Sequence, residues 1–324
     1  MNEHVSSGVD GAHPTGDVAG VDLRCDNCGA ALVVEASART TRCPYCASPA
    51  IVERPPTPDR PVPAFTLPFV FSAERATELV RAWLRSRGFF RDPKLRTAVI
   101  DEMRGVYVPA YLYSAIARSE FAAEIGENYL ERETYTERDS NGNTVTRTRT
   151  VTKTEWRTLH GRRSSYVMDI LVTASRGLAN AELERIEPFD LRQLRRYEPA
   201  LVAGWLAEEP TLTVAACFEL ARGEALASVG RALAAFMPGD THRGLRHSTT
   251  LQHESAALVH VPVWILAARH DPKKPPVRIV MNGQSGEIFG LAPLSALRIA
   301  AVIGIVVLFV VAVVFYARYR GGVA

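Results

Sequence analysis

The sequence predicts an α+β protein in three parts: a small β unit built around cysteines, a larger α+β body, and one apolar helix at the C-terminus. Three observations lead to this prediction. Four of the five cysteines lie in two Cys-x-x-Cys pairs within residues 25–46, residues 299–316 contain no charge and no proline, and the chain between them alternates between helical and strand-type apolar spacing. The chain of 324 residues, 47% of them apolar, has room for about two domains.

Residues 1–20 are expected to form a disordered tail. They contain three acidic residues, no lysine or arginine, and no apolar run, which is the reverse of a secretory signal. Without export, the thiols face the reducing cytosol, where paired cysteines bind metal more often than they form disulfides. The formal net charge of +3 neither requires nor excludes a polyanionic partner.

The two cysteine pairs predict a zinc ribbon over residues 21–52. A structural Zn²⁺ ion takes four thiolates at tetrahedral corners, and each Cys-x-x-Cys turn supplies two of them. Fourteen residues separate the pairs, which is enough for a hairpin of strands 31–35 and 38–42. The alternatives are two unrelated thiol pairs or a redox Cys-x-x-Cys motif. The predicted ligands of one structural zinc ion are Cys25, Cys28, Cys43 and Cys46.

The ribbon is a poor candidate for binding nucleic acid. Residues 21–60 contain five basic and five acidic side chains, whereas binding to phosphates depends on cations. Contact with protein, or a purely structural role, is therefore favoured. Residues 53–63 contain five prolines and predict an extended linker that holds the ribbon away from the body; the alternative is an ordered strap packed on the body.

Residues 64–295 predict one α+β body in which the same order of elements occurs twice. A helix with a serine cap at 72–87 precedes a buried strand at 105–117. Further along the chain, a helix at about 212–236 precedes a strand at 259–268.

The two strands of this body also resemble each other. They align from Val108-Pro and Val261-Pro onward, with an aromatic residue two positions after each proline. We therefore predict an internal duplication of residues 64–175 and 198–290; chance similarity of two apolar strands is the alternative. Proline within a strand indicates an edge, a bulge or the start of a strand.

Residues 127–163 predict an exposed β-hairpin arm inserted into the first half. Every even position from 144 to 154 is threonine, so all six threonines share one face of a strand. Neither face is apolar, as the strand of a core would be. From Arg147 to Arg163 six basic residues stand against Glu155 alone, so the arm is either a decorated loop or a docking surface for anionic lipid headgroups or an acidic protein.

Residues 298–317 predict a single transmembrane helix. The segment is apolar on every face, with Arg298 before it and two tyrosines and two arginines at its end. A buried helix of a soluble protein is the alternative. The positive flank favours a cytosolic C-terminus, but a long preceding region without a signal is hard to translocate, and zinc thiolates need a reducing compartment. We therefore expect a tail-anchored protein of the cytoplasmic (inner) membrane, single-pass, with its bulk in the cytoplasm.

Motifs that would indicate catalysis are missing from the sequence. The chain has no Gly-Lys dipeptide, no His-Glu-x-x-His and no Gly-x-Ser-x-Gly. Cys217 lies in an apolar helix and is interpreted as a core residue rather than a nucleophile. We expect a protein that is not an enzyme; a hydrolase or transferase whose site is invisible in the sequence is the alternative. Five histidines also lie close together in the sequence: His242, His247, His253, His260 and His270. They are interpreted as part of a polar strand, and a second metal site is the alternative.

Several motifs follow the cysteine ribbon in a defined order. They are Gly105-Val-Tyr-Val-Pro-Ala-Tyr-Leu, Asp169-Ile-Leu-Val-Thr-Ala-Ser175, Pro188-Phe-Asp-Leu191, Tyr197-Glu-Pro-Ala-Leu-Val-Ala-Gly-Trp205, Val261-Pro-Val-Trp264 and Asn282-Gly-Gln-Ser-Gly-Glu-Ile-Phe-Gly290. From Cys25 to about Gly290 the chain resembles the bacterial membrane proteins often labelled as TFIIB-type zinc-ribbon proteins. Some similar proteins are labelled after the primosomal helicase, but no nucleotide-binding loop accompanies the ribbon here.

This resemblance implies a non-catalytic protein of the cytoplasmic membrane, with phage-shock-type and flotillin-like (SPFH) membrane-stress proteins as partners. It implies zinc-ligand roles for the four cysteines of the ribbon. The sequence departs from the family pattern at Ala47, where glycine is common. The predicted function is a scaffold that recruits soluble proteins to the membrane in envelope stress. The alternative is a membrane-associated protein that binds nucleic acid.

Overall fold

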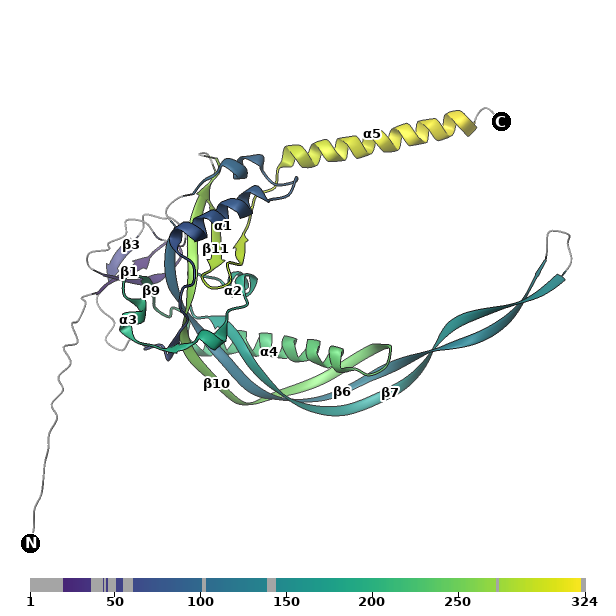
Figure 1. Ribbon diagram of the computed structural model, residues 1–324, viewed down its shortest axis with the longest axis horizontal. Coiled ribbons are helices and arrows are strands. Elements are labelled where there is room, and N and C mark those ends of the chain that lie inside the picture. The colour runs from purple at the N-terminus through teal and green to yellow at the C-terminus, as the bar shows by residue number, and fades with distance from the viewer. Residues whose placement is uncertain are drawn as a thin grey trace, which may run out of the picture.

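The computed structural model describes residues 20–35, 43, 45, 51–54, 61–100, 103–138, 144–271 and 274–321. These residues form a mixed α+β structure around one large sheet (Figure 1). Its strands are β1 (Gly20–Cys25), β2 (Ala31–Glu35), β3 (Ile51–Arg54), β4 (Phe65–Thr66), β5 (Val99–Ile100), β6 (Arg104–Arg138), β7 (Thr144–Thr173), β8 (Arg195–Arg196), β9 (Leu206–Glu208), β10 (Thr241–Arg269), β11 (Val277–Asn282) and β12 (Ile288–Gly290). Its helices are α1 (Ala73–Arg85), α2 (Asn180–Ile186), α3 (Pro199–Val202), α4 (Val214–Phe236) and α5 (Ala296–Gly321), with 3-10 turns η1 (Pro93–Thr97) and η2 (Leu191–Gln193).

The strands of the N-terminal ribbon belong to the same sheet as the body. The order is β12-β11-β10-β6-β9-β2-β1-β3, in which β2 pairs with β9 and β9 runs parallel to β6. Leu23, Cys25 and Cys43 share one buried cluster with Val106 and Val261 of the body. The prediction that the ribbon is held away from the body is therefore wrong. So small a unit cannot bury its own apolar side chains, and it uses the body to do so.

Other predictions about the ribbon fall only partly on described residues. The predicted strand 31–35 is β2, whereas 38–42 lies outside the described residues. β3 pairs with β1, so the first two residues of the predicted 53–63 linker belong to a strand. Residues 55–60 of that linker also lie outside the described residues.

β6 and β10 form the antiparallel centre of the body. Val108 lies opposite Val261, and the flanking pairs join Pro109 to His260 and Tyr107 to Pro262. These are the positions that align in the sequence, so a local two-fold axis through the Val108–Val261 pair would exchange the two strands. α1 packs on β10 and β11, whereas α4 packs on β6, β7 and β10. α1 thus covers strands of the other predicted half, whereas α4 covers strands of both halves; the duplication itself stays a prediction.

Both prolines of this pair lie where a strand changes its neighbour. β6 pairs with β9 before Pro109 and with β7 after it. β10 pairs with β4 before Pro262 and with β11 after it. A proline has no N–H for a strand ladder, so a change of neighbour is a place inside a sheet that tolerates it. The expected edge, bulge or strand start is therefore wrong for both prolines.

The two long helices of the body follow the predicted spacing and begin at polar caps. The side chain of Ser72 accepts a hydrogen bond from the N–H of Arg75 at 3.4 Å. Thr213 caps α4 in the same way, through the N–H of Ala216 at 3.3 Å. Buried residues recur every fourth position of α4, at Cys217, Ala221, Ala225, Val229 and Leu233. Most of them are small, so α4 lies close against the sheet.

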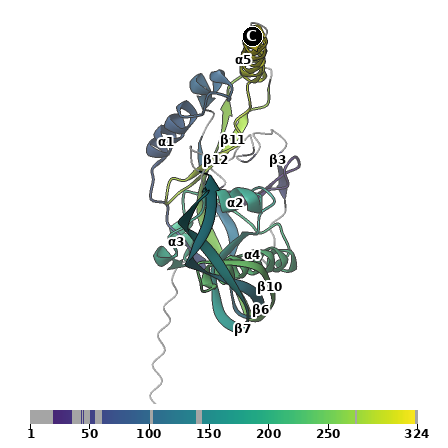
Figure 2. The same cartoon turned by 90° about the vertical axis from the view of Figure 1, so that its right-hand side faces the viewer.

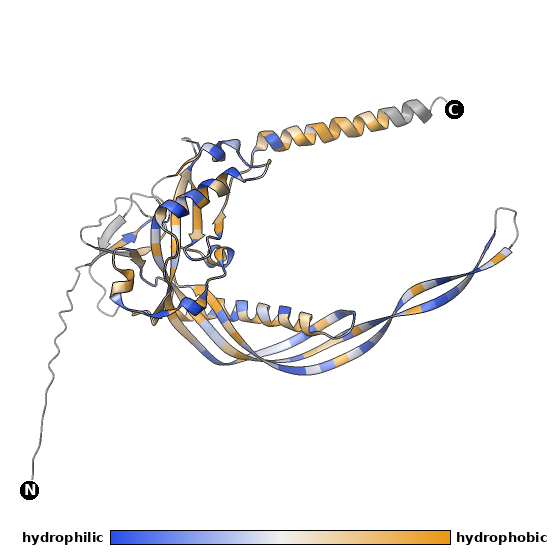
Figure 3. Ribbon diagram, viewed as in Figure 1, coloured by the Kyte–Doolittle hydropathy of each residue, from blue (hydrophilic) through white to orange (hydrophobic). Residues whose placement is uncertain are grey.

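β6 and β7 continue beyond the rest of the sheet as a two-stranded arm, which we define as Glu127–Arg138 with Thr144–Glu155. β10 begins opposite Gly126, so within the described residues no third strand accompanies the arm. Most of its residues are polar, with scattered apolar ones such as Leu130 and Val145, and they are largely exposed on both faces (Figure 3). An exposed hairpin was expected at 127–163, but residues 157–163 lie in the three-stranded part of the sheet.

α5 leaves the body at the end of the chain. Residues Ala296–Phe315 have a mean hydropathy of 3.0 and none of them is buried, so the helix is long and apolar enough to cross a membrane. α5 and the arm leave the body on the same side of the molecule (Figures 1 and 2).

Candidate metal centre and neighbouring surfaces

Three of the four predicted zinc ligands lie together at the end of β1. The Sγ atoms of Cys25, Cys28 and Cys43 all lie within 4.8 Å of one another, and those of Cys28 and Cys43 are 3.6 Å apart. Thiolates bound tetrahedrally to one Zn²⁺ ion would be about 3.8 Å apart, given a Zn–S distance of about 2.3 Å. The donor set therefore fits a metal ion such as zinc. Cys46, the fourth predicted ligand, lies outside the described residues.

The turn that holds the first pair is formed by backbone hydrogen bonds. The N–H of Gly29 donates to the carbonyl of Cys25 at 2.8 Å, and the N–H of Cys25 donates to the carbonyl of Ala30 at 2.9 Å. Gly29 has a φ of 76°, the left-handed region that glycine adopts without strain. The glycine after the second cysteine thus lets the chain turn from the first cysteine pair into β2 without strain.

A buried carboxyl group ties the metal loop to the body. Glu208 on β9 is 2% exposed; it accepts a hydrogen bond from the hydroxyl of Ser175 at 2.6 Å and another from the hydroxyl of Tyr45. Tyr45 is two residues beyond Cys43 and is itself buried. Burial raises the pKa of Glu208 to about 8, and the two hydroxyl groups oppose that shift. We call Tyr45, Ser175 and Glu208 the docking triad.

Sequence reasoning missed the docking triad. Tyr45 lies between two predicted ligands, but Glu208 and Ser175 are far away in the chain, and nothing in their own neighbourhoods marks them as buried. Arg278 adds a second contact, because its guanidinium lies 5.4 Å from the ring of Tyr45 and 3.2 Å from the carboxylate of Glu182. The centre is thus held by residues from several parts of the body.

Two other predicted chemical groups stay separate in the structure. Cys217 is buried in α4, where burial raises the pKa of its thiol, as suits a core residue. Burial also lowers the pKa of His260 to about 4, between the rings of Tyr107 and Tyr197. Within the described residues, only the three ribbon cysteines form a group that could hold a metal ion, so the histidines do not form a second site there.

The arm does not carry the unbalanced positive charge that the sequence indicates. Five of the six basic side chains from Arg147 to Arg163 lie near a carboxylate on β6, whereas Arg163 donates to the carbonyl of Ala232, so the count along one strand was misleading. The ion pairs are Arg147–Glu137 (3.5 Å), Arg149–Glu133 (3.1 Å), Lys153–Glu131 (2.7 Å), Arg157–Glu127 (2.9 Å) and Arg162–Glu120 (2.9 Å). The expected excess of cations on the arm is therefore wrong.

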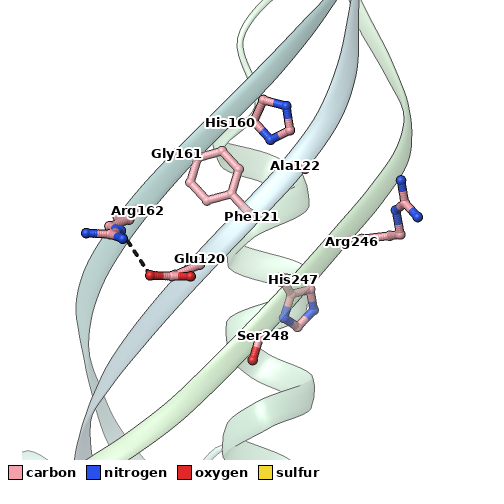
Figure 4. A pocket seen from close by; sticks show the side chains of 9 residues that line it. All are labelled: Glu120, Phe121, Ala122, His160, Gly161, Arg162, Arg246, His247 and Ser248. Carbon is pink, nitrogen blue, oxygen red and sulfur yellow. Dashed lines mark ion pairs between the residues drawn. The ribbon is translucent and has the colours of Figure 1, made fainter.

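The face of β7, β6 and β10 that points away from α4 contains a shallow hollow of about 560 Å³ (Figure 4). Glu120 and Arg162 lie in it as an ion pair. Arg246 borders the hollow, and Arg118 lines the adjoining one. Neither Arg118 nor Arg246 has a carboxylate within ion-pair distance among the described residues. This outer face is therefore open, polar and positive.

A pair of half-buried glutamates makes stability depend on pH. Burial raises the pKa of Glu187 to about 7 and also raises the pKa of Glu224. Between pH 5 and 7 the folded protein keeps protons that the unfolded chain has released. Stability is thus full below the ordinary glutamate pKa of 4.5 and falls as the pH rises through 7.

In the native chain, the ionisation of Glu187 should lower the free energy of unfolding by about 1 to 2 kcal/mol between pH 5 and pH 7.5, after allowing for solvent screening. We expect Glu187→Gln to lack this part of the pH dependence. The measurement is the thermal midpoint of the native chain and the variant in detergent micelles at pH 5 and pH 7.5. Glu78→Gln on the exposed face of α1 is the control and should behave as the native chain does. Equal pH dependence in native chain and Glu187→Gln would contradict the prediction.

Comparison with known proteins shows one distant relative. YdjG of Bacillus subtilis, an uncharacterized protein, is 25% identical over 246 residues, which is 74% of this chain and 66% of the relative. The match thus spans just under two thirds of the relative's own length. No family model matches the chain, and no solved structure matches it.

Proposed function

We propose that this protein is a non-catalytic, tail-anchored scaffold that recruits soluble proteins to the cytoplasmic face of the bacterial membrane. One observation carries the proposal: an exposed apolar helix and a long, exposed β-arm leave the same side of one body. The helix suits a lipid layer and the arm suits a protein. The resemblance to TFIIB-type zinc-ribbon membrane proteins supports it, with SPFH or phage-shock-type proteins as candidate partners in envelope stress.

The exposure of α5 supports anchoring. Leu308 is 70% exposed and Phe309 is 68% exposed, on a helix with no charge between Ile299 and Phe315. A stretch of this length that is apolar on every side needs hydrocarbon or an apolar partner around it. The arm is largely polar and leaves the body on the same side as α5 (Figure 1), so the proposal requires α5 to enter the bilayer at an angle that leaves the arm in water.

The arm is the element we assign to recruitment. A two-stranded ribbon without a core is only marginally stable in water, and ordering its residues costs conformational entropy. Beyond Gly126 none of the arm's described residues is buried, so burial against the body does little to offset this cost. Contacts with a bound partner would offset it. Because the arm's own charges are paired, we assign the electrostatic part of the contact to Arg118 and Arg246 on the outer face, and hence an acidic partner.

The zinc ribbon has a structural role in this proposal. It extends the sheet of the body through β2 and β9, and the docking triad holds it there. This differs from a ribbon that reaches out for partners, because its apolar residues are already in contact with the body.

Proximity labelling in the native cell tests the proposal. The chain is compared with an arm-shortened variant in which Asn-Gly replaces residues 130–152, so that the opposed pair Tyr129–Lys153 closes the hairpin. We expect the arm-shortened variant to stay in the membrane fraction but to lose most of the soluble proteins that the native chain labels.

Two further variants sharpen this test. Arg118→Glu with Arg246→Glu should weaken the same contacts without shortening the arm, whereas Arg196→Glu, an exposed charge on β8, is the matched control. An unchanged set of labelled proteins after arm shortening would remove the arm from the proposed function.

Nucleic-acid binding at the membrane is the second candidate, and the unpaired arginines of the outer face are the observation that favours it. In that case, affinity would fall steeply with salt, and nuclease treatment would abolish the labelling that depends on Arg118 and Arg246. Labelling that survives nuclease supports the protein scaffold instead.

A further inference from the structure

Exposed apolar side chains surround the place where α5 begins. Phe89 and Phe90, in the loop after α1, are 60% and 48% exposed. Leu291 and Leu294, which precede α5, and Leu297 in its first turn are 80%, 57% and 82% exposed. Two neighbouring aromatic rings and three leucines in water form an apolar patch that is continuous with the apolar surface of α5.

Hydrogen bonds fix the loop to the start of the helix. The N–H of Ser295 donates to the carbonyl of Phe90 at 2.9 Å, and the N–H of Asp92 donates to the carbonyl of Pro293 at 3.0 Å. The guanidinium of Arg298 donates to the carbonyl of Phe89 at 2.9 Å and lies 5.0 Å from its ring. Arg91 forms a backbone bridge with Leu294. The two phenylalanines therefore keep a set position beside the first turn of α5.

The same region carries an excess of positive charge. Residues 85–100 contain five basic side chains against one acidic residue, Asp92; Lys94 pairs with Asp271 at 2.8 Å, which leaves four arginines. The carboxylate of Asp92 lies 3.5 Å from Lys274 and accepts the N–H of Lys94 at 3.0 Å, so it is already engaged. Arg85 and Arg96 are exposed, and neither has a carboxylate within ion-pair distance in the part of the chain that the structure describes.

We propose that this region is a lipid-binding collar, defined as Arg85–Arg96 together with Leu291–Arg298. Phe89 and Phe90 insert at the boundary between headgroups and acyl chains, and the arginines bind the phosphates of anionic phospholipids. The inference rests on the proposed function in one respect, that α5 spans a bilayer. If α5 spans, the collar lies at the bilayer surface, where aromatic rings and arginines are favoured.

The collar gives the body a second attachment to the membrane. A single helix leaves a body free to turn about the point of entry, whereas an inserted aromatic pair beside that point restricts this motion. The arm would then keep one orientation relative to the membrane.

Brominated lipids test the collar in the full chain. Phe89→Trp and Phe90→Trp place a fluorophore at positions that are exposed, so these changes leave the fold intact. The chain is reconstituted in nanodiscs of phosphatidylcholine, with or without about one third phosphatidylglycerol, the anionic proportion being chosen to mimic a negative leaflet. Bromine at a shallow acyl position should quench the added fluorescence at least twofold, while Phe236→Trp at the end of α4 should show no such quenching.

A charge variant tests the choice of lipid. In the Phe90→Trp chain, anionic lipid should increase the quenching, and Arg85→Glu with Arg96→Glu should remove that increase. Quenching that is equal in neutral and anionic discs would overturn the binding of anionic headgroups.

Flotation of vesicles in carbonate separates this inference from the proposed function. A native chain that does not float with the vesicles would overturn both the anchor and the collar. A chain that floats but shows no quenching at either phenylalanine position would overturn the collar alone, and the proposed anchor would stand.

Discussion

The Cys28→Ser variant is expected to lose its zinc. Purified under reducing conditions without chelator, the native chain should carry about one zinc ion, and the variant less than about a tenth of that, because a neutral hydroxyl is a poor ligand for Zn²⁺. Elemental analysis of the metal per chain after dialysis is the measurement.

Loss of the metal should also loosen the edge of the sheet. Cys25 and Cys43 lie in the same buried cluster as strands of the body, so the repulsion of unligated thiolates would act inside a shared core. A structural zinc ion contributes its binding free energy to folding. We therefore expect the thermal midpoint of Cys28→Ser to fall by about 5 °C or more in detergent micelles.

Cys217→Ser is the matched control for this prediction. It removes the remaining cysteine, which is buried in α4 and lies 3.5 Å from the carbonyl of Thr173, where a serine hydroxyl can donate as well. This variant should keep its zinc. A native chain without metal, or a Cys28→Ser chain that retains it, would show that the three clustered cysteines do not form a zinc site.

The Glu208→Ala variant is expected to detach the metal loop from the body. Alanine leaves the hydroxyls of Tyr45 and Ser175 without their shared acceptor in a buried place, and such a loss costs about 3 kcal/mol. The zinc should then be released to a chelator at least about tenfold faster, because that free energy is lost from the closed state alone. Release is followed with a colorimetric chelator.

Two substitutions show whether the effect comes from the docking triad. Glu208→Gln keeps one oxygen that can accept a hydrogen bond, so its release rate should lie between those of the native chain and the alanine variant. Glu219→Ala, which removes an exposed carboxylate that pairs with Arg222, should leave the rate unchanged. Equal rates in the native chain and Glu208→Ala would mean that the triad does not hold the loop.

Local signals in the sequence predicted several features of the structure. The repeat of apolar residues predicted α1 and α4 to within a few residues, with the cap at Ser72 as a further signal for α1, because a helix is decided by neighbours one turn apart. The period-two pattern of residues 144–154, in which neither face is apolar, predicted the exposed hairpin. A strand that buries neither face does not require apolar side chains. Cysteine spacing predicted the metal-binding cluster, in which three of the four expected ligands lie together; Cys46 lies outside the described residues.

Features that depend on two distant segments were missed. The arm was expected to be basic because only β7 was counted, and pairing with β6 supplied the opposing carboxylates. The ribbon was expected to stand apart because prolines follow it, yet pairing of β2 with β9 joins it to the body. Neither Glu208 nor Ser175 carries a local sign of burial.

The sequence by itself determined that this chain has a cysteine cluster, two long helices in the body, an exposed hairpin and one long apolar helix. Each depends on spacing along the chain, which a reader of residues can count. Only the tertiary structure decided that the ribbon continues the body's sheet, that the arm's charges are paired, and that Phe89 and Phe90 lie beside the start of α5. Those features arise because the free energy of folding depends on which surfaces come into contact. Contacts between distant segments cannot be predicted from the residues of either segment alone.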